Sequence, residues 1–182
     1  FDLEPGDPLQ LKSWAFSERS RSDKFFRNNG DGTFTDITRA AGIPATNTYG
    51  NAAMWWDYDE DGWMDLYISN DFQEGDFLYR NQGDGTFVES IREATPNTPW
   101  FSMGSATGDL NNDGRLDALV GDMAATTHYA AKVNMGSMNS FFHFLDHAEP
   151  RQFMRNALYL GTGTRRLLEV ASLTGLAKTD WT

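Results

Sequence analysis

Short runs of alternating apolar and polar residues recur along the chain, separated by turns rich in Gly, Asp and Asn. A side-chain period of two predicts β-strands, whereas an amphipathic helix needs a period of 3.6. One complete unit predicts strands at residues 51–56, 66–69, 77–80 and 86–91. Its last two strands flank Asp84-Gly85, and an Asp-Gly pair between aromatic runs is a strong signal for a hairpin.

The hairpin sequence occurs three times, at residues 24–37, 77–91 and 157–170. The first two copies share Arg-Asn-x-Gly-Asp-Gly-Thr-Phe, whereas Thr164-Arg165 replaces the Asp-Gly pair in the third. Four short strands in a period of about 50 residues are typical of one β-propeller blade, and the strand period excludes a helical solenoid. The predicted fold is all-β, a partial β-propeller of four-stranded antiparallel blades.

The repeats divide the chain into an irregular lead-in at residues 1–22 and a propeller fragment at residues 23–182. We expect a half blade, two blades and the start of a further blade at residues 23–43, 49–95, 100–171 and 179–182. Residues 123–155 interrupt the second blade as an irregular or helical insertion, which holds all three histidines. Because propellers close with about 4–8 blades, we expect the chain to be part of a longer polypeptide or a larger assembly.

Two acidic stretches, residues 57–65 and 109–117, separate the first two strands of each predicted blade. Polar oxygen ligands occupy positions one, three, five and nine of each stretch, with glycine at position six. Two like charges about 4 Å apart repel by roughly 4 kcal/mol at an effective dielectric of about 20. A folded loop of this kind therefore needs raised carboxyl pKa values or a cation, and its ligand spacing suits calcium.

The expected cofactor is Ca²⁺, bound at two sites. The first set of ligands is Asp57, Asp59, Asp61, the carbonyl of Trp63, and Asp65. The second set is Asp109, Asn111, Asp113, the carbonyl of Arg115, and Asp117. Neither loop is an EF-hand, because Ile68 and Val120 stand where the closing Glu would be, and apolar strands follow. The alternative is an acidic surface turn that binds no ion.

Charge and composition narrow the possible partners. The chain has 26 Asp and Glu against 15 Lys and Arg, so nucleic acid and anionic membranes are not expected to bind it. No apolar run is long enough to span a membrane, and without cysteine there is no disulfide or thiolate site. Loops lacking a strong closing ligand suit the millimolar calcium outside cells. We therefore expect an exported protein that is extracellular, on the cell surface or periplasmic.

The acidic loop, the apolar strand after it and the Tyr-Arg-Asn-x-Gly-Asp-Gly-Thr-Phe hairpin together resemble the FG-GAP/VCBS repeat family. The resemblance covers about residues 23–122 and 156–182 and implies a calcium-binding β-propeller with the loop ligands given above. Residues 27–38 and the later Thr-Asp-Trp-Thr are most similar to the branch related to cartilage acidic protein, the ASPIC type. The insertion at residues 123–155 has no counterpart in the repeat.

The predicted function is a binding or scaffold module for a protein partner or a cell surface, with the insertion as a contact surface. The alternatives are a glycan-binding or calcium-assisted polysaccharide-processing propeller, and a subunit of a larger assembly. The sequence shows no nucleophile elbow, zinc-protease helix or triad, so no catalytic residue is assigned and enzymatic activity is not expected. His143 and His147, spaced i and i+4, are a candidate transition-metal pair that His128 or Asp146 would complete.

Overall fold

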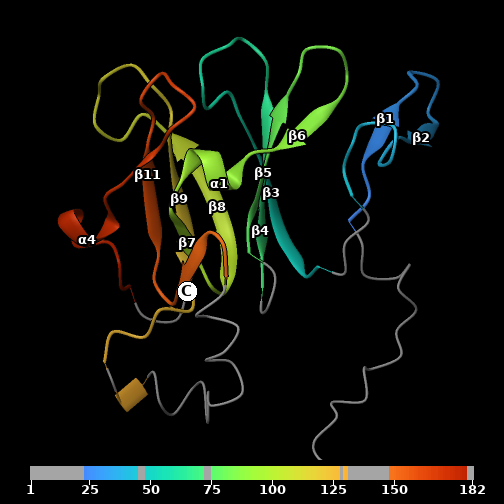
Figure 1. The fold of residues 1–182 in the computed structure, drawn as a ribbon. Coiled ribbons are helices and arrows are strands. Elements are labelled where there is room, and N and C mark those ends of the chain that lie inside the picture. The colour runs from blue at the N-terminus through green and yellow to red at the C-terminus, as the bar shows by residue number, and fades with distance from the viewer. Residues whose placement is uncertain (1–22, 45–47, 72–74, 128, 131–147, 180–182) are drawn as a thin grey trace, which may run out of the picture.

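The computed structural model of the chain describes residues 23–44, 48–71, 75–127, 129–130 and 148–179 (Figure 1). The predicted lead-in at residues 1–22 lies outside this part. The described strands form two four-stranded sheets and two two-stranded sheets. The all-β prediction with four-stranded antiparallel blades is confirmed.

Blade one contains the strands β3 (Gly50–Trp56), β4 (Asp65–Asn70), β5 (Phe77–Asn81) and β6 (Phe87–Glu89). They pair antiparallel in chain order. Every residue of β4 is buried, since both faces of the blade are covered. The predicted fourth strand is too long, because the short helix α1 (Ile91–Ala94) begins where the Glu89 carboxylate accepts the N–H of Ile91.

Blade two contains the strands β8 (Ser102–Gly108), β9 (Asp117–Asp122), β11 (Ala157–Leu160) and β12 (Leu168–Glu169), followed by α4 (Ala171–Thr174). Inside the predicted insertion lies β10 (Arg151–Phe153), which pairs in parallel with β7 (Asn97–Pro99). The local pattern did not predict this pair, because three-residue strands from distant segments have no readable period. Residues 131–147 of the predicted insertion lie outside the described residues.

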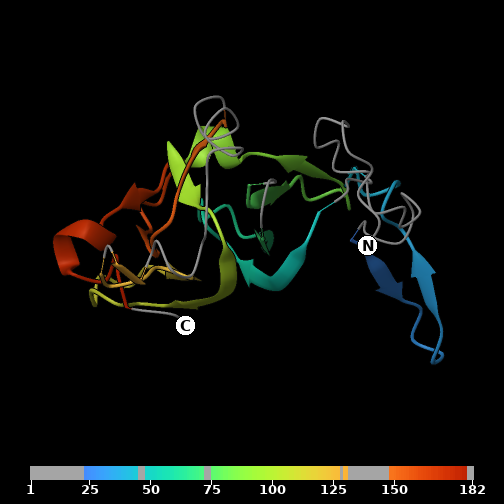
Figure 2. The same ribbon diagram turned by 90° about the horizontal axis from the view of Figure 1, so that it is seen from below.

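The hairpin of β1 (Phe26–Asn28) and β2 (Phe34–Asp36) precedes blade one in the chain. Seen from below, this hairpin, blade one and blade two follow one another in chain order (Figure 2). The same backbone bond joins each unit to the next. The N–H of Phe87 donates to the carbonyl of Ala41 at 2.8 Å, and that of Leu167 to Ala94 at 2.9 Å.

An aromatic core fills the space between the two blades. Trp56, Tyr67 and Tyr159 are fully buried there, and the indole of Trp56 donates to the carbonyl of Leu116 at 3.1 Å. Trp55 points to the other face, where its ring centroid lies 5.9 Å from that of Phe25. Adjacent residues of a strand point to opposite faces, which accounts for the different surroundings of Trp55 and Trp56. No helix in the described part of the chain is long and apolar enough to cross a membrane.

A polar side chain lies just before the third strand of each blade, and in blade one it links the blade to the next. Asp76 accepts the N–H of Asn70 at 2.8 Å and the hydroxyl of Ser102, the first residue of β8, at 2.7 Å. In blade two, Asn156 accepts the N–H of Asp122 at 2.8 Å and donates to the Thr179 hydroxyl at 2.8 Å. We call Asp76 the interblade link and Asn156 its counterpart in blade two.

Candidate metal centre

Both acidic loops join the first strand of a blade to the second. The loop at residues 57–64 connects β3 to β4, and the loop at residues 109–116 connects β8 to β9. The two loops lie at the same end of the sheets, the upper end in Figure 1, together with the hairpin turns. The repeat therefore brings together two acidic segments that are far apart in the sequence.

Backbone hydrogen bonds to the first carboxylate fold the loop of blade one back on itself. Asp57 accepts the N–H groups of Asp61 and Gly62, both at 3.1 Å, and Asp61 accepts that of Trp63 at 2.9 Å. Gly62 has a φ of 90°, a conformation that glycine adopts without steric cost. Glu60 has a φ of 59°, so position four also lies in the left-handed region.

The loop of blade two makes the same turn. Asp109 accepts the N–H groups of Asp113 at 3.1 Å and Gly114 at 3.0 Å, and Asp113 accepts that of Arg115 at 2.9 Å. Asn112 and Gly114 have φ values of 60° and 88°, close to those of their counterparts in blade one. The spacing of Asp and Gly thus gives the two loops the same backbone conformation.

The aspartates at position nine, Asp65 and Asp117, are fully buried. Asp65 accepts the N–H groups of Asn81 at 2.8 Å and Tyr58 at 3.1 Å. Burial raises the pKa of Asp65 to about 6, against the lowering effect of these two bonds. Asp117 likewise accepts two backbone N–H groups, from Gly161 and Leu110, each at 2.9 Å. Position nine therefore ties each loop to the third strand of its blade, and its role as a ligand stays a prediction.

Asp57, Asp59 and Asp61 bring one potential ligand atom each to within 4.8 Å of one another. The Asp59 side chain is only 5% exposed, and its Oδ1 is buried without a hydrogen-bond partner. Burial and then the charge of Asp61 raise the pKa of Asp59, while Arg80 and Arg165 lower it. An unpartnered carboxylate oxygen in a buried position is costly. Three converging carboxylates are the oxygen ligands that a hard divalent cation prefers.

The second loop has one carboxylate fewer at the equivalent place, because Asn111 is uncharged. Its Oδ1 accepts the N–H of Asp113 at 3.0 Å, and its amide nitrogen donates to Asp113 Oδ2 at 3.0 Å. Asp113 is solvated, and the backbone N–H of Arg115 is the main cause of its lowered pKa. Within the described residues, only the loop of blade one contains three acidic or histidine side chains converging in this way. The second site stays a prediction.

The residues at position seven anchor the two loops to their surroundings. A Cβ at Gly83 would lie 2.8 Å from the indole nitrogen of Trp63, so the Trp63 ring packs directly on the hairpin turn of blade one. The Nε of Arg115 lies 2.9 Å from Glu60 Oε1, which connects the second loop to the first. The Nε of Arg165 lies 3.7 Å from Asp59 Oδ2.

Glu60, Arg80 and Arg165 surround this site, and the sequence pattern did not predict their part in it. Glu60 lies at position four, outside the ligand spacing, and Arg80 lies in the hairpin motif. The one available signal was at Arg165, where the third hairpin departs from the Asp-Gly pattern. The candidate histidine site at His128, His143 and His147, with Asp146, lies outside the described residues.

Comparisons with known proteins agree with the repeat architecture. No curated protein matches the chain. The sequence pattern of the FG-GAP-like repeat matches residues 14–68 and again residues 57–120. The first match ends with the first acidic loop and β4, and the second ends with the second loop and most of β9. Because these matches together cover more than half of the chain, the protein belongs to the FG-GAP-like repeat family.

Proposed function

We propose that this chain is a calcium-binding β-propeller module of an exported protein, which binds another protein or a cell surface. The observation that carries the calcium proposal is the buried, unpartnered Oδ1 of Asp59 between the carboxylates of Asp57 and Asp61. Membership of the FG-GAP-like repeat family supports a role as an interaction module. The millimolar calcium outside cells would fill such a loop without a closing Glu.

In the first site, Asp57, Asp59, Asp61, the carbonyl of Trp63, and Asp65 would hold the ion. Bound calcium would offset the repulsion among these carboxylates and stabilise the folded loop. The second site would use Asp109, Asn111, Asp113, the carbonyl of Arg115, and Asp117. We expect it to bind more weakly, because Asn111 brings no charge and its amide is already hydrogen-bonded to Asp113.

The hairpin sequence at residues 27–38 supports the assignment to the branch related to cartilage acidic protein. This branch assignment is part of the proposal, as is export to the extracellular space, the cell surface or the periplasm. The acidic net charge of −11 is compatible with a partner other than nucleic acid.

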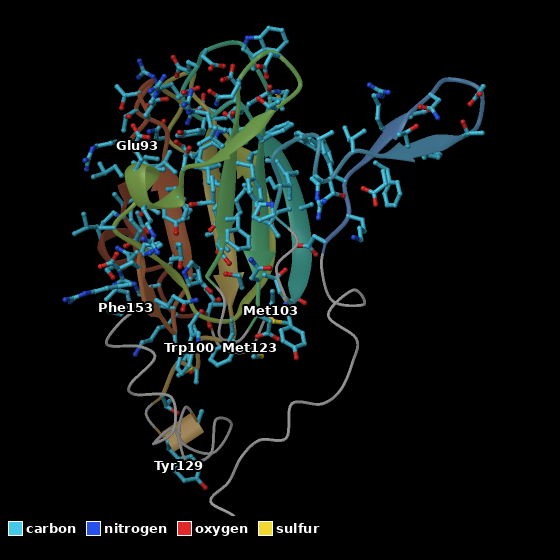
Figure 3. The ribbon with its side chains drawn as sticks, turned by 45° about the vertical axis from the view of Figure 1, so that its right-hand side comes forward. Glu93, Trp100, Met103, Met123, Tyr129 and Phe153 are labelled. Carbon is cyan, nitrogen blue, oxygen red and sulfur yellow. The ribbon has the colours of Figure 1, made fainter. Side chains whose placement is uncertain are left out.

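A protein partner is supported by apolar side chains at the end of the sheets opposite the acidic loops. Figure 3 shows Met103 and Met123 at this end, with Phe153 nearby. Met103 and Phe153 are 38% and 41% exposed, and Tyr129 is 79% exposed. Met and aromatic side chains adapt well to a partner surface. The predicted insertion begins at Met123, so we propose this end as the contact surface.

Glycan binding is the second candidate, and one feature favours it. A hollow of about 480 Å³ lies between the first hairpin and blade one, lined by Phe25, Trp55 and Tyr79 together with Asp23 and Asn51. Trp55 is 45% exposed. Aromatic faces beside polar groups are suited to sugar rings. A glycan array probed with the wild type and Trp55→Ala tests this candidate, with Tyr129→Ala as the control, because Tyr129 is 79% exposed and does not line the hollow. Loss of signal only in Trp55→Ala would support it, and no signal from the wild type would reject it.

Thermal unfolding in excess calcium and in excess chelator tests the main proposal. We expect calcium to raise the Tm of the wild type, and Asp61→Ala and Asp113→Ala each to reduce the rise. Asp84→Ala is the matched control, because Asp84 is an acidic residue of a hairpin turn near the loops and accepts bonds only from Thr86. A Tm that does not respond to calcium would contradict the proposal.

A further inference from the structure

Arg165 extends from the third hairpin of the sequence, in blade two, to the acidic loop of blade one. Its Nε lies 3.7 Å from Asp59 Oδ2, and its side chain remains 56% exposed. In blade one the same turn carries the Asp-Gly pair, with Gly85 at a φ of 89°. Arg165 thus occupies a place where the repeat otherwise has a glycine without any side chain.

Close backbone contacts hold this turn beside both loops. The N–H of Gly161 donates to Asp117 Oδ1 at 2.9 Å, and a Cβ on Gly161 would lie 2.6 Å from the carbonyl oxygen of Leu116. A Cβ on Gly163 would lie 3.0 Å from Glu60 Oε2 and 3.1 Å from the Nε of Arg115. A Cβ at Gly161 would clash with the backbone and Gly163 has a φ of 65°, so both positions favour glycine and the turn lies close to both loops.

The charges around Asp59 come from both blades. Asp57 and Asp61 repel its carboxylate, while Arg80 of β5 and Arg165 of blade two attract it. Arg165 lies at Oδ2, whereas Oδ1 is the buried atom without a partner. A cation at Oδ1 and the guanidinium of Arg165 would therefore act on one carboxylate, and the two positive charges would repel each other.

We propose that Arg165 is a counter-charge of the first acidic loop, which stabilises the three carboxylates without calcium and lowers the loop's affinity for calcium. This inference rests on the proposed calcium binding. It makes the cation affinity of blade one depend on the hairpin turn of blade two. Any movement of that turn, for example on binding a partner, would change the affinity of the loop for calcium.

The test compares Arg165→Gln with Arg166→Gln, which removes the same charge one residue further along the same turn. The Tm is measured in chelator and in calcium, and the calcium affinity is titrated against a chromophoric chelator. We expect Arg165→Gln to lower the Tm in chelator, to enlarge the rise caused by calcium and to decrease the Kd by about two- to fivefold at low salt. The effect on Kd should shrink at high salt because the side chain is largely solvated. Arg166→Gln should resemble the wild type.

Two results would overturn this inference while leaving the proposed function intact. If Arg165→Gln lowers the Tm equally in chelator and in calcium, with the Kd unchanged, Arg165 only packs against the loop. If the Kd increases, Arg165 orients Asp59 for the ion rather than competing with it. A wild type whose Tm does not respond to calcium would instead refute the proposed function, and this inference with it.

Discussion

The acidic loop of blade one has Asp59 at its third position, whereas that of blade two has Asn111. Around these residues the two loops make the same turn, with the first Asp accepting the N–H groups of positions five and six in both. The third position differs in its contacts. Asp59 leaves one buried oxygen without a partner, whereas Asn111 forms two hydrogen bonds with Asp113.

The side chain before the third strand is likewise Asp in blade one and Asn in blade two. Asp76 of blade one is fully buried and accepts hydrogen bonds from Asn70, Tyr67 and Ser102. Burial raises its pKa to about 7. Asn156 of blade two accepts one backbone N–H and uses its amide nitrogen as a donor. A carboxylate in blade one and an amide in blade two thus accept the equivalent backbone N–H, that of the last residue of the second strand.

These two Asp and Asn pairs show that the backbone conformation and the binding of ions or protons depend on different properties of the side chain. Asp and Asn both offer an oxygen that accepts a backbone N–H, so either residue supports the same turn. Only the carboxylate adds a charge whose burial must be offset by a proton, a guanidinium or a metal. Blade one should therefore respond to calcium and pH more strongly than blade two.

The largest expected effect concerns position nine, where the two blades agree. Asp65→Ala and Asp117→Ala should each lower the free energy of unfolding by about 3 to 5 kcal/mol, since each leaves two backbone N–H groups without their acceptor. Urea unfolding in chelator measures this effect without any contribution from calcium. Asp84→Ala serves as the exposed control. A loss below about 1 kcal/mol in either variant would show that position nine does not hold the loop.

The stability of the protein should depend on pH through Asp76 and not through its counterpart Asn156, which does not titrate. Because the folded-state pKa of Asp76 is about 7 and the ordinary value is 3.8, the folded state keeps a proton that the unfolded chain has already lost. Stability should therefore fall as the pH rises from about 4 to 7. Asp76→Asn should be more stable than the wild type at pH 8 by about 2 to 4 kcal/mol, and similar to it near pH 4.

Urea unfolding at pH 5 and pH 8 checks this prediction. Part of the slope should persist in Asp76→Asn, because burial also raises the pKa of Asp122 to about 6. The reciprocal variant Asn156→Asp should lose stability at pH 8. If Asp76→Asn retained the whole slope of the wild type, the titration of Asp76 would not be its cause.

Replacing Asp59, at the third position of the first loop, by Asn should make the calcium response of blade one resemble that of blade two. Asp59→Asn removes one of three converging carboxylates, so we expect the stabilisation by calcium to fall by about 1 to 2 kcal/mol. Stability in chelator should be unchanged or slightly higher, because the repulsion decreases. Thermal unfolding in both conditions tests this expectation. A variant that responds to calcium as fully as the wild type would exclude Asp59 as a ligand.

The opposite substitution, at the third position of the second loop, should have the smallest effect. Asn111→Asp adds a carboxylate to the second loop and should strengthen its calcium binding by about three- to tenfold. Isothermal titration calorimetry should resolve this change, with Asn112→Asp as a control for the added charge at the neighbouring position. Equal effects of the two substitutions would mean that net charge, and not the third ligand position, determines the affinity.

Much of the architecture could be predicted from local patterns. The hairpin around Asp84-Gly85 and the opposite orientations of Trp55 and Trp56 depend on a period of two and on turn chemistry, which act over a few residues. The loop positions were predicted for the same reason, since spacing along nine residues determines which side chains can converge. The parallel pair β7 and β10 was missed, because its three-residue strands come from segments that are distant in the sequence.

The repeat, the strand order within each blade and the acidic loops could be predicted from the chain alone, because they arise from short-range periodicity and from Gly and Asp at defined positions. The set of buried groups and the charges that meet across the blades depend on the folded arrangement. Asp65 and Asp76 acquire raised pKa values through burial, and Glu60 and Asp59 meet arginines of blade two. Burial and contacts between distant segments depend on the packing of blade against blade, which no local pattern specifies.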